Sequence, residues 1–241
     1  MTTVAYDQFV VPVESKLNPI TFVRRVGPGL TLRTVAEQGW YTKLFLGLRA
    51  DLRRLPDVRP AKEPIEMTPR DPSTFDGFVR ELPNVDGNDY LEVLYRIWSC
   101  HAGVETLYVA DVDGRPAYAQ WLVRPADQHL IHAYKPGRYA QLAEDEVLLE
   151  GAYTFAAFRR MGMMADGMAQ LLRIARDEGM NGAITYVGSD NPPSLRGCAN
   201  VGFELDHVRH NERRLTRRRS EMAGPDGEAE AIWAAATAPR S

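Results

Sequence analysis

Two alternating segments joined by an Asp-Gly pair constrain the fold of this chain more than any other feature. Residues 105–111 and 116–123 both alternate apolar and polar side chains, as strands with one buried face do. The turn between them contains Asp113-Gly114, and such a pair between two alternating runs is the strongest short-range signal for a β-hairpin. The sequence therefore predicts two antiparallel strands near the middle of the chain.

After this hairpin the chain alternates strand-like and helix-like segments. Residues 147–155 and 183–187 are largely apolar and favour buried strands. Between them, residues 164–178 carry apolar side chains at helical spacing and stop at Gly179, which is typical of a helix C-terminus. The other predicted elements are a strand at 65–68, helices at 72–82 and 90–98, a short helix beginning near Asn191, and a last strand at 203–210. Strands that alternate with helices indicate an α/β fold.

The two ends of the chain differ in composition from this regular part. Residues 24–54 are basic, and their leucines and aromatic residues predict a helix over about 32–54. Three prolines in residues 55–64 then indicate an extended linker. After Arg219 the chain is rich in Ala, Glu, Gly and Pro. We therefore expect a partly helical N-terminal extension at 1–60, a core domain at 61–219 and a flexible C-terminal tail at 220–241.

Composition excludes several classes of protein. With 44% hydrophobic and 25% charged residues, the 241-residue chain is not disordered over most of its length, and a net charge of −3 argues against a surface built wholly for nucleic acid. Cys100 and Cys198 are too few for a disulfide framework, and the Cys and His residues have no metal-site spacing. Without a signal peptide or a run of about 18 apolar residues, we expect a cytoplasmic protein with no metal and no membrane partner.

The turn between the strand at 147–155 and the helix at 164–178 is a candidate anion site. A strand that leads through a glycine turn into a helix presents free backbone N–H groups and the positive end of the helix dipole. Gly162 supplies the glycine here. A single glycine does not distinguish a pyrophosphate site from an ordinary strand-to-helix turn, so both interpretations stay open at this point.

Two motifs make the pyrophosphate interpretation more specific. The chain reads Arg-x-x-Gly-x-Met at residues 159–164 and Asn-x-x-Ser-x-x-x-Cys-x-x-x-Gly-Phe at residues 191–203. These motifs and the order of the elements resemble the GNAT family of acyl-CoA-dependent N-acyltransferases, over about residues 64–210. Family members have Gly or Ala where this chain has Met164, and often have Tyr where it has Cys198.

The resemblance implies a fold and a donor substrate. The fold would be α/β, with a mixed twisted β-sheet flanked by helices and preceded by the helical N-terminal extension. The co-substrate would be acetyl-CoA or another acyl-CoA, whose thioester enters where the strands at 147–155 and 183–187 separate. Its pantetheine arm would pair with the backbone of Thr154 and Phe155, and the remaining contacts would come from Arg159, Arg160, Met161, Gly162, Met163, Met164 and Asn191.

Glu150 is the candidate general base for acyl transfer to an amine. It lies in an otherwise apolar strand, Leu148-Leu149-Glu150-Gly151, where partial burial would raise its pKa toward the useful range. The alternative is a carboxylate that faces solvent or pairs with a neighbouring arginine.

Cys198 allows two interpretations. Helical register places it on the inward face of the short helix, where a buried cysteine usually serves as a small hydrophobic residue. The resemblance implies instead that it protonates the departing CoA thiolate. A free thiol, with a pKa of about 8.5, is a stronger acid than a phenol, with a pKa of about 10.

The sequence therefore predicts an enzyme that transfers an acetyl or other short acyl group from acyl-CoA to the amine of a small molecule, by direct attack in a ternary complex. The basic residues at 24–54 and 213–219 leave open an aminoacyl transferase that uses aminoacyl-tRNA as its donor. A non-catalytic CoA-binding module is the third possibility. Residues 40–52 are expected to pack on the core or on a second subunit, which would make a homodimer.

Overall fold

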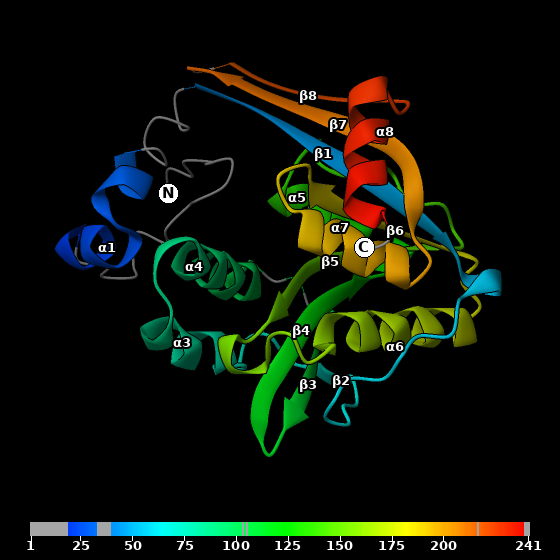
Figure 1. Cartoon of the computed structure of the whole chain (residues 1–241), viewed down its shortest axis with the longest axis horizontal. Coiled ribbons are helices and arrows are strands. Elements are labelled where there is room, and N and C mark those ends of the chain that lie inside the picture. Colours follow the sequence, from blue (N-terminus) through cyan, green and yellow to red (C-terminus); the bar gives the residue numbers. More distant parts are fainter. Residues whose placement is uncertain (1–18, 33–39, 103, 105, 216, 239–241) are drawn as a thin grey trace.

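The computed structural model describes residues 19–32, 40–102, 104, 106–215 and 217–238, and an eight-stranded sheet runs through its centre (Figure 1). The strand order is β2-β3-β4-β5-β6-β1-β7-β8, and among these described strands only β5 and β6 pair in parallel. The strands are β1 (Trp40–Asp51), β2 (Thr68–Arg70), β3 (Leu107–Val112), β4 (Arg115–Val123), β5 (Glu146–Thr154), β6 (Gly182–Gly188), β7 (Glu204–Arg214) and β8 (Arg217–Ala223). The helices are α1 (Pro19–Val26), α3 (Gly77–Glu81), α4 (Gly87–His101), α5 (Gln128–Tyr134), α6 (Met163–Asp177), α7 (Pro192–Asn200) and α8 (Gly227–Thr237). The predicted mixed sheet flanked by helices is confirmed.

The predicted hairpin is present as β3 and β4. Asp113 and Gly114 occupy its turn with φ angles of 50° and 71°. Two consecutive positive φ angles define the type I′ turn, whose twist matches that of the flanking strands, so the local sequence alone determined this element.

The predicted helix over 32–54 is wrong, because residues 40–51 form the strand β1. β1 lies between β6 and β7 in the sheet. The expected domain boundary at residue 60 is therefore wrong, because it would separate β1 from the strands with which it pairs. Leu44, Leu46 and Leu48 are buried at a spacing of two residues, which is the period of a strand rather than of a helix. Residues 1–18 and 33–39 of the expected extension lie outside the described residues.

The expected flexible tail is also wrong for most of its length. β8 pairs with β7 from Arg217 to Ala223, so β7 is not the last strand. Asp226 caps the N-terminus of α8, because its carboxylate accepts a hydrogen bond of 2.8 Å from the Ala229 backbone N–H. Ala229 and Ala236 are buried in the same core cluster as Leu195 of α7. The C-terminal segment therefore belongs to the folded domain.

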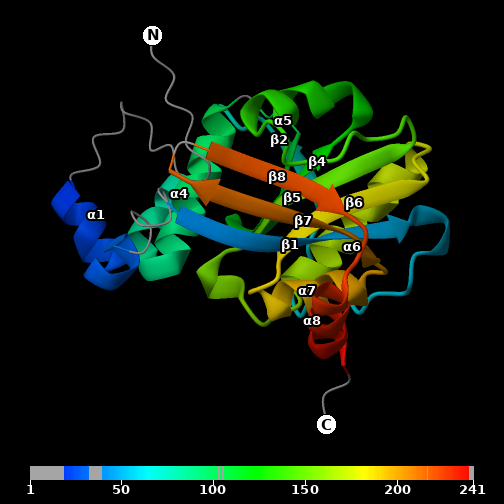
Figure 2. The ribbon, with the colours of Figure 1, turned by 90° about the horizontal axis from the view of Figure 1, so that it is seen from above.

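The helices form layers on both sides of the sheet. Seen from above, α7 and α8 lie on the opposite side of the sheet from α5 (Figure 2). β5 and β6 are paired only from Glu146 to Leu149 and from Gly182 to Thr185, and beyond those residues each strand continues without the other. This separation opens the sheet at its middle. In the described part of the chain, none of the helices has the length and apolar character to cross a membrane.

Candidate functional site

A cavity of about 330 Å³ lies where β5 and β6 separate, and residues from both faces of the sheet line it. On one side is the α6–α7 wall, which consists of Met164, Met168, Ser194 and Cys198. On the other is the charged wall, which consists of Tyr95, Arg96, Lys135, Arg138, Tyr139, Glu150 and Arg209. The cavity therefore lies beside the point where β5 and β6 separate, and elements of different chemistry line it.

The turn before α6 has the geometry of an anion site. Arg160 and Gly162 have φ angles of 63° and 85°, and Gly162 is the N-cap of the helix. The first N–H groups of a helix have no acceptor within the helix, so those of residues 163–165 point out of its N-terminus. These residues fit the pyrophosphate of an acyl-CoA.

The chain itself crosses this turn on one side. The Lys62 backbone N–H donates to the Met161 carbonyl at 2.8 Å, and the Ala61 N–H donates to Asp166 at 2.9 Å. A Cβ on Gly162 would lie 3.3 Å from the Ala61 Cα. Glycine is thus required at this position both for its φ angle and for its lack of a side chain.

Of the predicted donor-binding residues, Met164 and Asn191 line the cavity. Met164 reaches α7, where a side chain on Gly197 would meet its Cε at 3.0 Å. Asn191 caps α7 by accepting a hydrogen bond of 3.2 Å from the Ser194 N–H. Thr154, Phe155, Arg159, Arg160, Met161, Gly162 and Met163 are not among the cavity-lining residues.

Contacts within the chain also engage Thr154, Phe155 and Arg159. Arg159 forms an ion pair of 2.6 Å with Asp89 of α4 and donates to the Thr154 carbonyl at 3.4 Å. The Phe155 N–H donates to the Ala117 carbonyl at 3.0 Å, and its own carbonyl accepts from Phe158 at 2.9 Å. Phe155 therefore does not offer the backbone pairing that was expected of it, and the predicted role of Arg159 at the pyrophosphate lacks support from its contacts.

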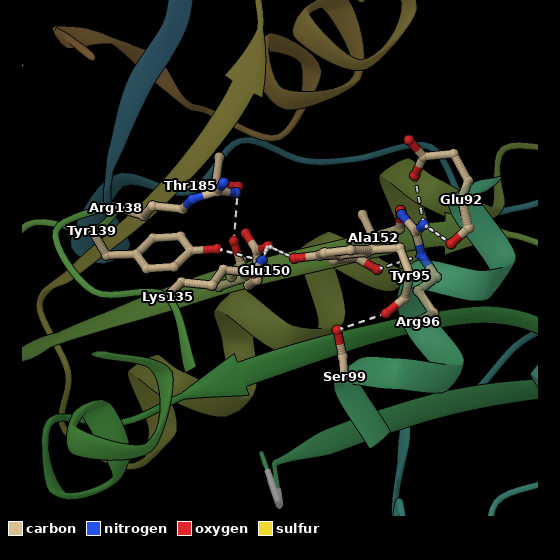
Figure 3. Close-up of polar contacts among 12 residues, drawn as sticks. Glu92, Tyr95, Arg96, Ser99, Lys135, Arg138, Tyr139, Glu150, Ala152 and Thr185 are labelled. Carbon is tan, nitrogen blue, oxygen red and sulfur yellow. Dashed lines mark hydrogen bonds and ion pairs between the residues drawn. The ribbon is translucent and has the colours of Figure 1, made fainter. Parts of the chain in front are cut away.

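Glu150 lies at the centre of the charged wall (Figure 3). One of its carboxylate oxygens is 2.8 Å from the Lys135 Nζ and accepts a hydrogen bond of 3.2 Å from the Tyr95 hydroxyl. Lys135 also donates to the Tyr139 hydroxyl at 2.8 Å. Three segments distant in sequence, α4, β5 and the end of α5, thus meet at one carboxylate.

The ionisation of this pair differs from the prediction. Burial raises the pKa of Glu150, but the charge and hydrogen bond of Lys135 outweigh it, so the net shift is downward from the usual value. The predicted rise in the pKa of Glu150 is therefore wrong. Burial, opposed by Glu150 and reinforced by the charges of Arg138 and Arg209, lowers the pKa of Lys135 to about 8. Lys135 is the member of the pair that titrates near neutral pH.

Cys198 is a free, buried thiol in the α6–α7 wall. Burial raises its pKa to about 12, so the argument that it is a stronger acid than tyrosine is wrong for this environment. Leu195 and Phe203 belong to the same core cluster, as core filling requires. The role of Cys198 as the acid that protonates the CoA thiolate stays a prediction, and the raised pKa of its thiol does not support that role.

The fold brings several residues to the cavity that the sequence did not indicate. Lys135 and Arg138 follow α5, which was not predicted, and Arg209 lies on β7. Tyr186 also lines the cavity, and His207 contacts its hydroxyl at 3.0 Å and Asp206 at 2.8 Å, so this histidine is not isolated. The sequence shows these residues only as polar or charged side chains, and a side chain's type does not specify what it contacts.

Several solved structures are similar to this chain at low sequence identity. A GCN5-related glucosamine N-acetyltransferase region of a fungal multi-domain GH3 β-N-acetylglucosaminidase aligns with a TM-score of 0.50 and 16% identity, over 76% of this chain and 22% of that one. A GNAT-family acetyltransferase from Colwellia psychrerythraea aligns with a TM-score of 0.49 and 12% identity, over 78% of this chain and 62% of its own. For a GCN5-related N-acetyltransferase from Sphaerobacter thermophilus, the TM-score is 0.48 and the identity 13%, over 85% and 60% of the two chains.

These similarities concern the fold. The chain spans less than two thirds of the length of each of the three proteins. No protein-family model matches the sequence, and a comparison with curated proteins also gave no match. The alignment at a TM-score of 0.50, together with the observed sheet, confirms the predicted GNAT-like fold.

Proposed function

We propose that this protein transfers an acetyl or other short acyl group from acyl-CoA to the amine of a small molecule. The observation that supports this proposal is the cavity beyond Leu149 and Thr185, where β5 and β6 separate, with α6 and α7 on one side and the charged wall on the other. Two substrates can approach it from opposite faces and meet inside it. Such a meeting favours direct attack by the amine, because alignment of two bound reactants supplies much of the rate enhancement without a covalent enzyme intermediate.

The α6–α7 wall is the side from which the acyl donor would enter. The N–H groups at the start of α6 would hold its pyrophosphate, and the apolar side chains of Met164 and Met168 would contact its arm. Cys198 is a poor nucleophile there, because only the thiolate attacks and burial keeps the thiol protonated. The chemistry therefore falls to the incoming amine.

The Lys135–Glu150 pair would take the proton that the amine must lose. Lys135, with its pKa lowered to about 8, is partly neutral at physiological pH and can accept a proton. Glu150, at 2.8 Å from its Nζ, stabilises the charged lysine that results. In this proposal Lys135 is the proton acceptor, and Glu150, the base expected from the sequence, assists it.

The size of the cavity supports a small acceptor. About 330 Å³ is at the lower end of the range for small-molecule sites, and it must also contain the reactive end of the donor. An amine of amino-acid size fits this space, whereas a macromolecule would have to insert a single side chain.

Titration calorimetry with acetyl-CoA and release of free CoA thiol in the presence of an amine panel test the proposal directly. We expect acetyl-CoA to bind and at least one amine to accelerate thiol release at least tenfold over the background hydrolysis. Binding without transfer to any amine would favour a CoA-binding module. Binding of a charged tRNA in place of acetyl-CoA would favour the aminoacyl transferase.

A further inference from the structure

Tyr186, His207 and Asp206 form a chain of hydrogen bonds that leads from the cavity to the surface. Tyr186 lines the cavity, and its hydroxyl is 3.0 Å from Nε2 of His207. Nδ1 of the same ring is 2.8 Å from a carboxylate oxygen of Asp206. The exposed fraction of the side chain rises from 14% for His207 to 37% for Asp206. We call these three residues the Tyr–His–Asp chain.

The direction of each hydrogen bond follows from the groups that make it. A carboxylate can only accept, so Nδ1 of His207 carries the proton that Asp206 accepts. In the neutral ring Nε2 is then an acceptor, and the Tyr186 hydroxyl donates to it. The Ala140 N–H donates to the same hydroxyl at 2.9 Å. A hydroxyl has one proton and two acceptor sites, so these contacts of the described residues leave one acceptor site for a ligand.

Asp206 is also held from its other side. Its second carboxylate oxygen accepts a hydrogen bond of 3.2 Å from Nε of Arg49 on β1, and Arg49 pairs in turn with Glu146 of β5. A carboxylate fixed in this way orients an imidazole and stabilises its protonated form. Asp206 is therefore placed to hold His207 in one tautomer.

The inner end of the Tyr–His–Asp chain faces two further titratable side chains. The guanidinium of Arg209 lies 4.8 Å from the centre of the Tyr186 ring, and the Tyr139 ring lies 5.5 Å from it. Burial raises the pKa of Tyr186, although the charges of Arg209 and Arg49 oppose the rise. The phenol therefore stays protonated and can pass on its proton only while it receives another.

A glycine in the strand between Tyr186 and His207 makes their contact possible. Gly47 of β1 is paired with Tyr186 of β6 on one side and with His207 of β7 on the other. Residues directly opposite one another point to the same face, so the two rings meet over Gly47, with centroids 5.2 Å apart. A Cβ at residue 47 would overlap the His207 ring. Because glycine weakens the interior of a strand, its use here favours a function for the contact.

The proposed reaction has to remove two protons from the acceptor. A primary alkylamine resembles the lysine side chain, with a pKa of about 10.4, so it arrives as an ammonium ion at neutral pH. One proton leaves before the nitrogen attacks, and a second leaves as the amide forms. One of the two ends on the CoA sulfur, and the other has to reach solvent. Lys135 accepts only one proton, so a second acceptor is needed.

We propose that the Tyr–His–Asp chain is a proton relay that deprotonates the bound ammonium ion and delivers its proton to solvent. This inference rests on the proposed function and adds Tyr186 to it as a catalytic residue, with His207 and Asp206 acting through Tyr186.

The relay moves one proton out of the cavity in each turnover. An N–H bond of the ammonium ion breaks, its electron pair stays on nitrogen, and its proton goes to the Tyr186 oxygen. The hydroxyl proton of Tyr186 passes at the same time to Nε2 of His207. The imidazolium, stabilised by Asp206, then loses a proton to water, which restores the neutral ring. Histidine suits this step because its side chain changes charge between about pH 5 and 8.

Tyr186→Phe tests the relay by removing only the hydroxyl. With the amine that stimulates thiol release most, we expect kcat at about pH 7 to fall at least tenfold relative to the wild type. At about pH 10 the loss should shrink to within about threefold, because the amine then arrives without its extra proton. Steady-state kinetics at both pH values measures the losses, and calorimetry should show acetyl-CoA affinity within about twofold of the wild type.

The control for this variant is His210→Gln, which changes a half-buried histidine of β7 outside the Tyr–His–Asp chain. We expect its kcat to stay within about twofold of the wild type at both pH values. An equal loss in Tyr186→Phe at the two pH values would mean that the hydroxyl is only structural. No loss at about pH 7 would remove Tyr186 from the reaction.

Gly47→Ala tests the relay without changing any group that titrates. Its methyl group would displace the His207 ring, so we expect the same pH-dependent loss of kcat as in Tyr186→Phe. Gly224→Ala, at a glycine with open space around it, is the control. Normal turnover at about pH 7 in a folded Gly47→Ala variant counts against the relay. If circular dichroism shows that Gly47→Ala does not fold, Tyr186→Phe decides, because it keeps the ring.

The protonation of His207 can be measured without any substrate, which separates this inference from the proposed function. NMR of the imidazole nitrogens, with His207→Gln to assign the signals, reports which nitrogen carries the proton. We expect the neutral ring to carry it on Nδ1, and Tyr186→Phe to remove the hydrogen bond at Nε2. A neutral ring with its proton on Nε2 would overturn the relay, even in an active enzyme. If no amine releases thiol from acetyl-CoA, the proposed function fails and the relay fails with it.

Discussion

The α6–α7 wall and the charged wall face the same cavity but are built from different kinds of group. The α6–α7 wall offers backbone N–H groups and apolar side chains from two helices that are close in sequence. The charged wall collects ionised side chains from α4, β5, β7 and the segment after α5. Backbone N–H groups suit a part that every donor molecule shares, such as a pyrophosphate. A particular set of charged side chains suits one kind of acceptor. Under the proposed function, the donor would therefore bind at the α6–α7 wall and the charged wall would select the acceptor.

The largest expected effect comes from Glu150→Gln in the charged wall. The amide cannot stabilise a protonated Lys135, so we expect kcat for acyl transfer to fall about 10²-fold or more while acetyl-CoA affinity stays unchanged. Steady-state kinetics and calorimetry measure the two quantities. Glu144→Gln, an exposed carboxylate just before the same strand, is the matched control. Near-normal turnover in Glu150→Gln would remove the pair from the mechanism.

A second difference between the walls is the pH dependence of stability. The pKa of Lys135 in the folded protein is about 8, below its usual value of 10.5, so the unfolded chain binds more protons between these values. Stability should therefore rise with pH from about 8 to 10.5, by up to about 3 kcal/mol relative to Lys135→Met.

Urea unfolding of the wild type and of Lys135→Met across this pH range measures the difference. Lys62→Met, which alters an exposed lysine, should follow the wild-type curve. A wild type and a Lys135→Met variant with parallel curves would mean that Lys135 keeps an ordinary pKa.

At the turn before α6, outside the cavity lining, Gly162→Val should weaken acetyl-CoA binding about tenfold or more. Valine is strained at a φ of 85° and would crowd Ala61, which would displace the N–H groups that we propose bind the pyrophosphate. Gly179→Val imposes the same kind of strain at a φ of 91° with open space around it, at the far end of α6, and serves as the control. Calorimetric affinities that agree between the two variants would mean that this turn is not the donor site.

The smallest effect is expected for Cys198→Ala. Because burial makes the thiol a weak acid, we expect turnover within about twofold of the wild type and a stability loss of about 1 kcal/mol from the lost packing. Steady-state kinetics measures the change in turnover, and thermal unfolding of the same samples measures the change in stability. A turnover about 10²-fold slower with unchanged acetyl-CoA affinity would instead identify Cys198 as the acid.

Local sequence determined the elements whose geometry depends on neighbouring residues. Asp113-Gly114 was enough for the hairpin, because few other residues adopt two consecutive positive φ angles. Gly162 and the periodic apolar side chains after it were enough for α6 and its exposed N-terminus. The turn before α6 could thus be found from sequence, and with it the resemblance to a known fold.

Only the tertiary structure decided the identity of β1 and the composition of the charged wall. Residues 40–51 are apolar and basic in an order that allows either a helix or a strand, and pairing with both β6 and β7 determined the outcome. Glu150 was visible as a carboxylate in an apolar strand, but its pKa depends on Lys135, which reaches it from another segment. A charge in a sequence has no defined ionisation until the fold supplies its neighbours, because burial and nearby charges shift the pKa in opposite directions.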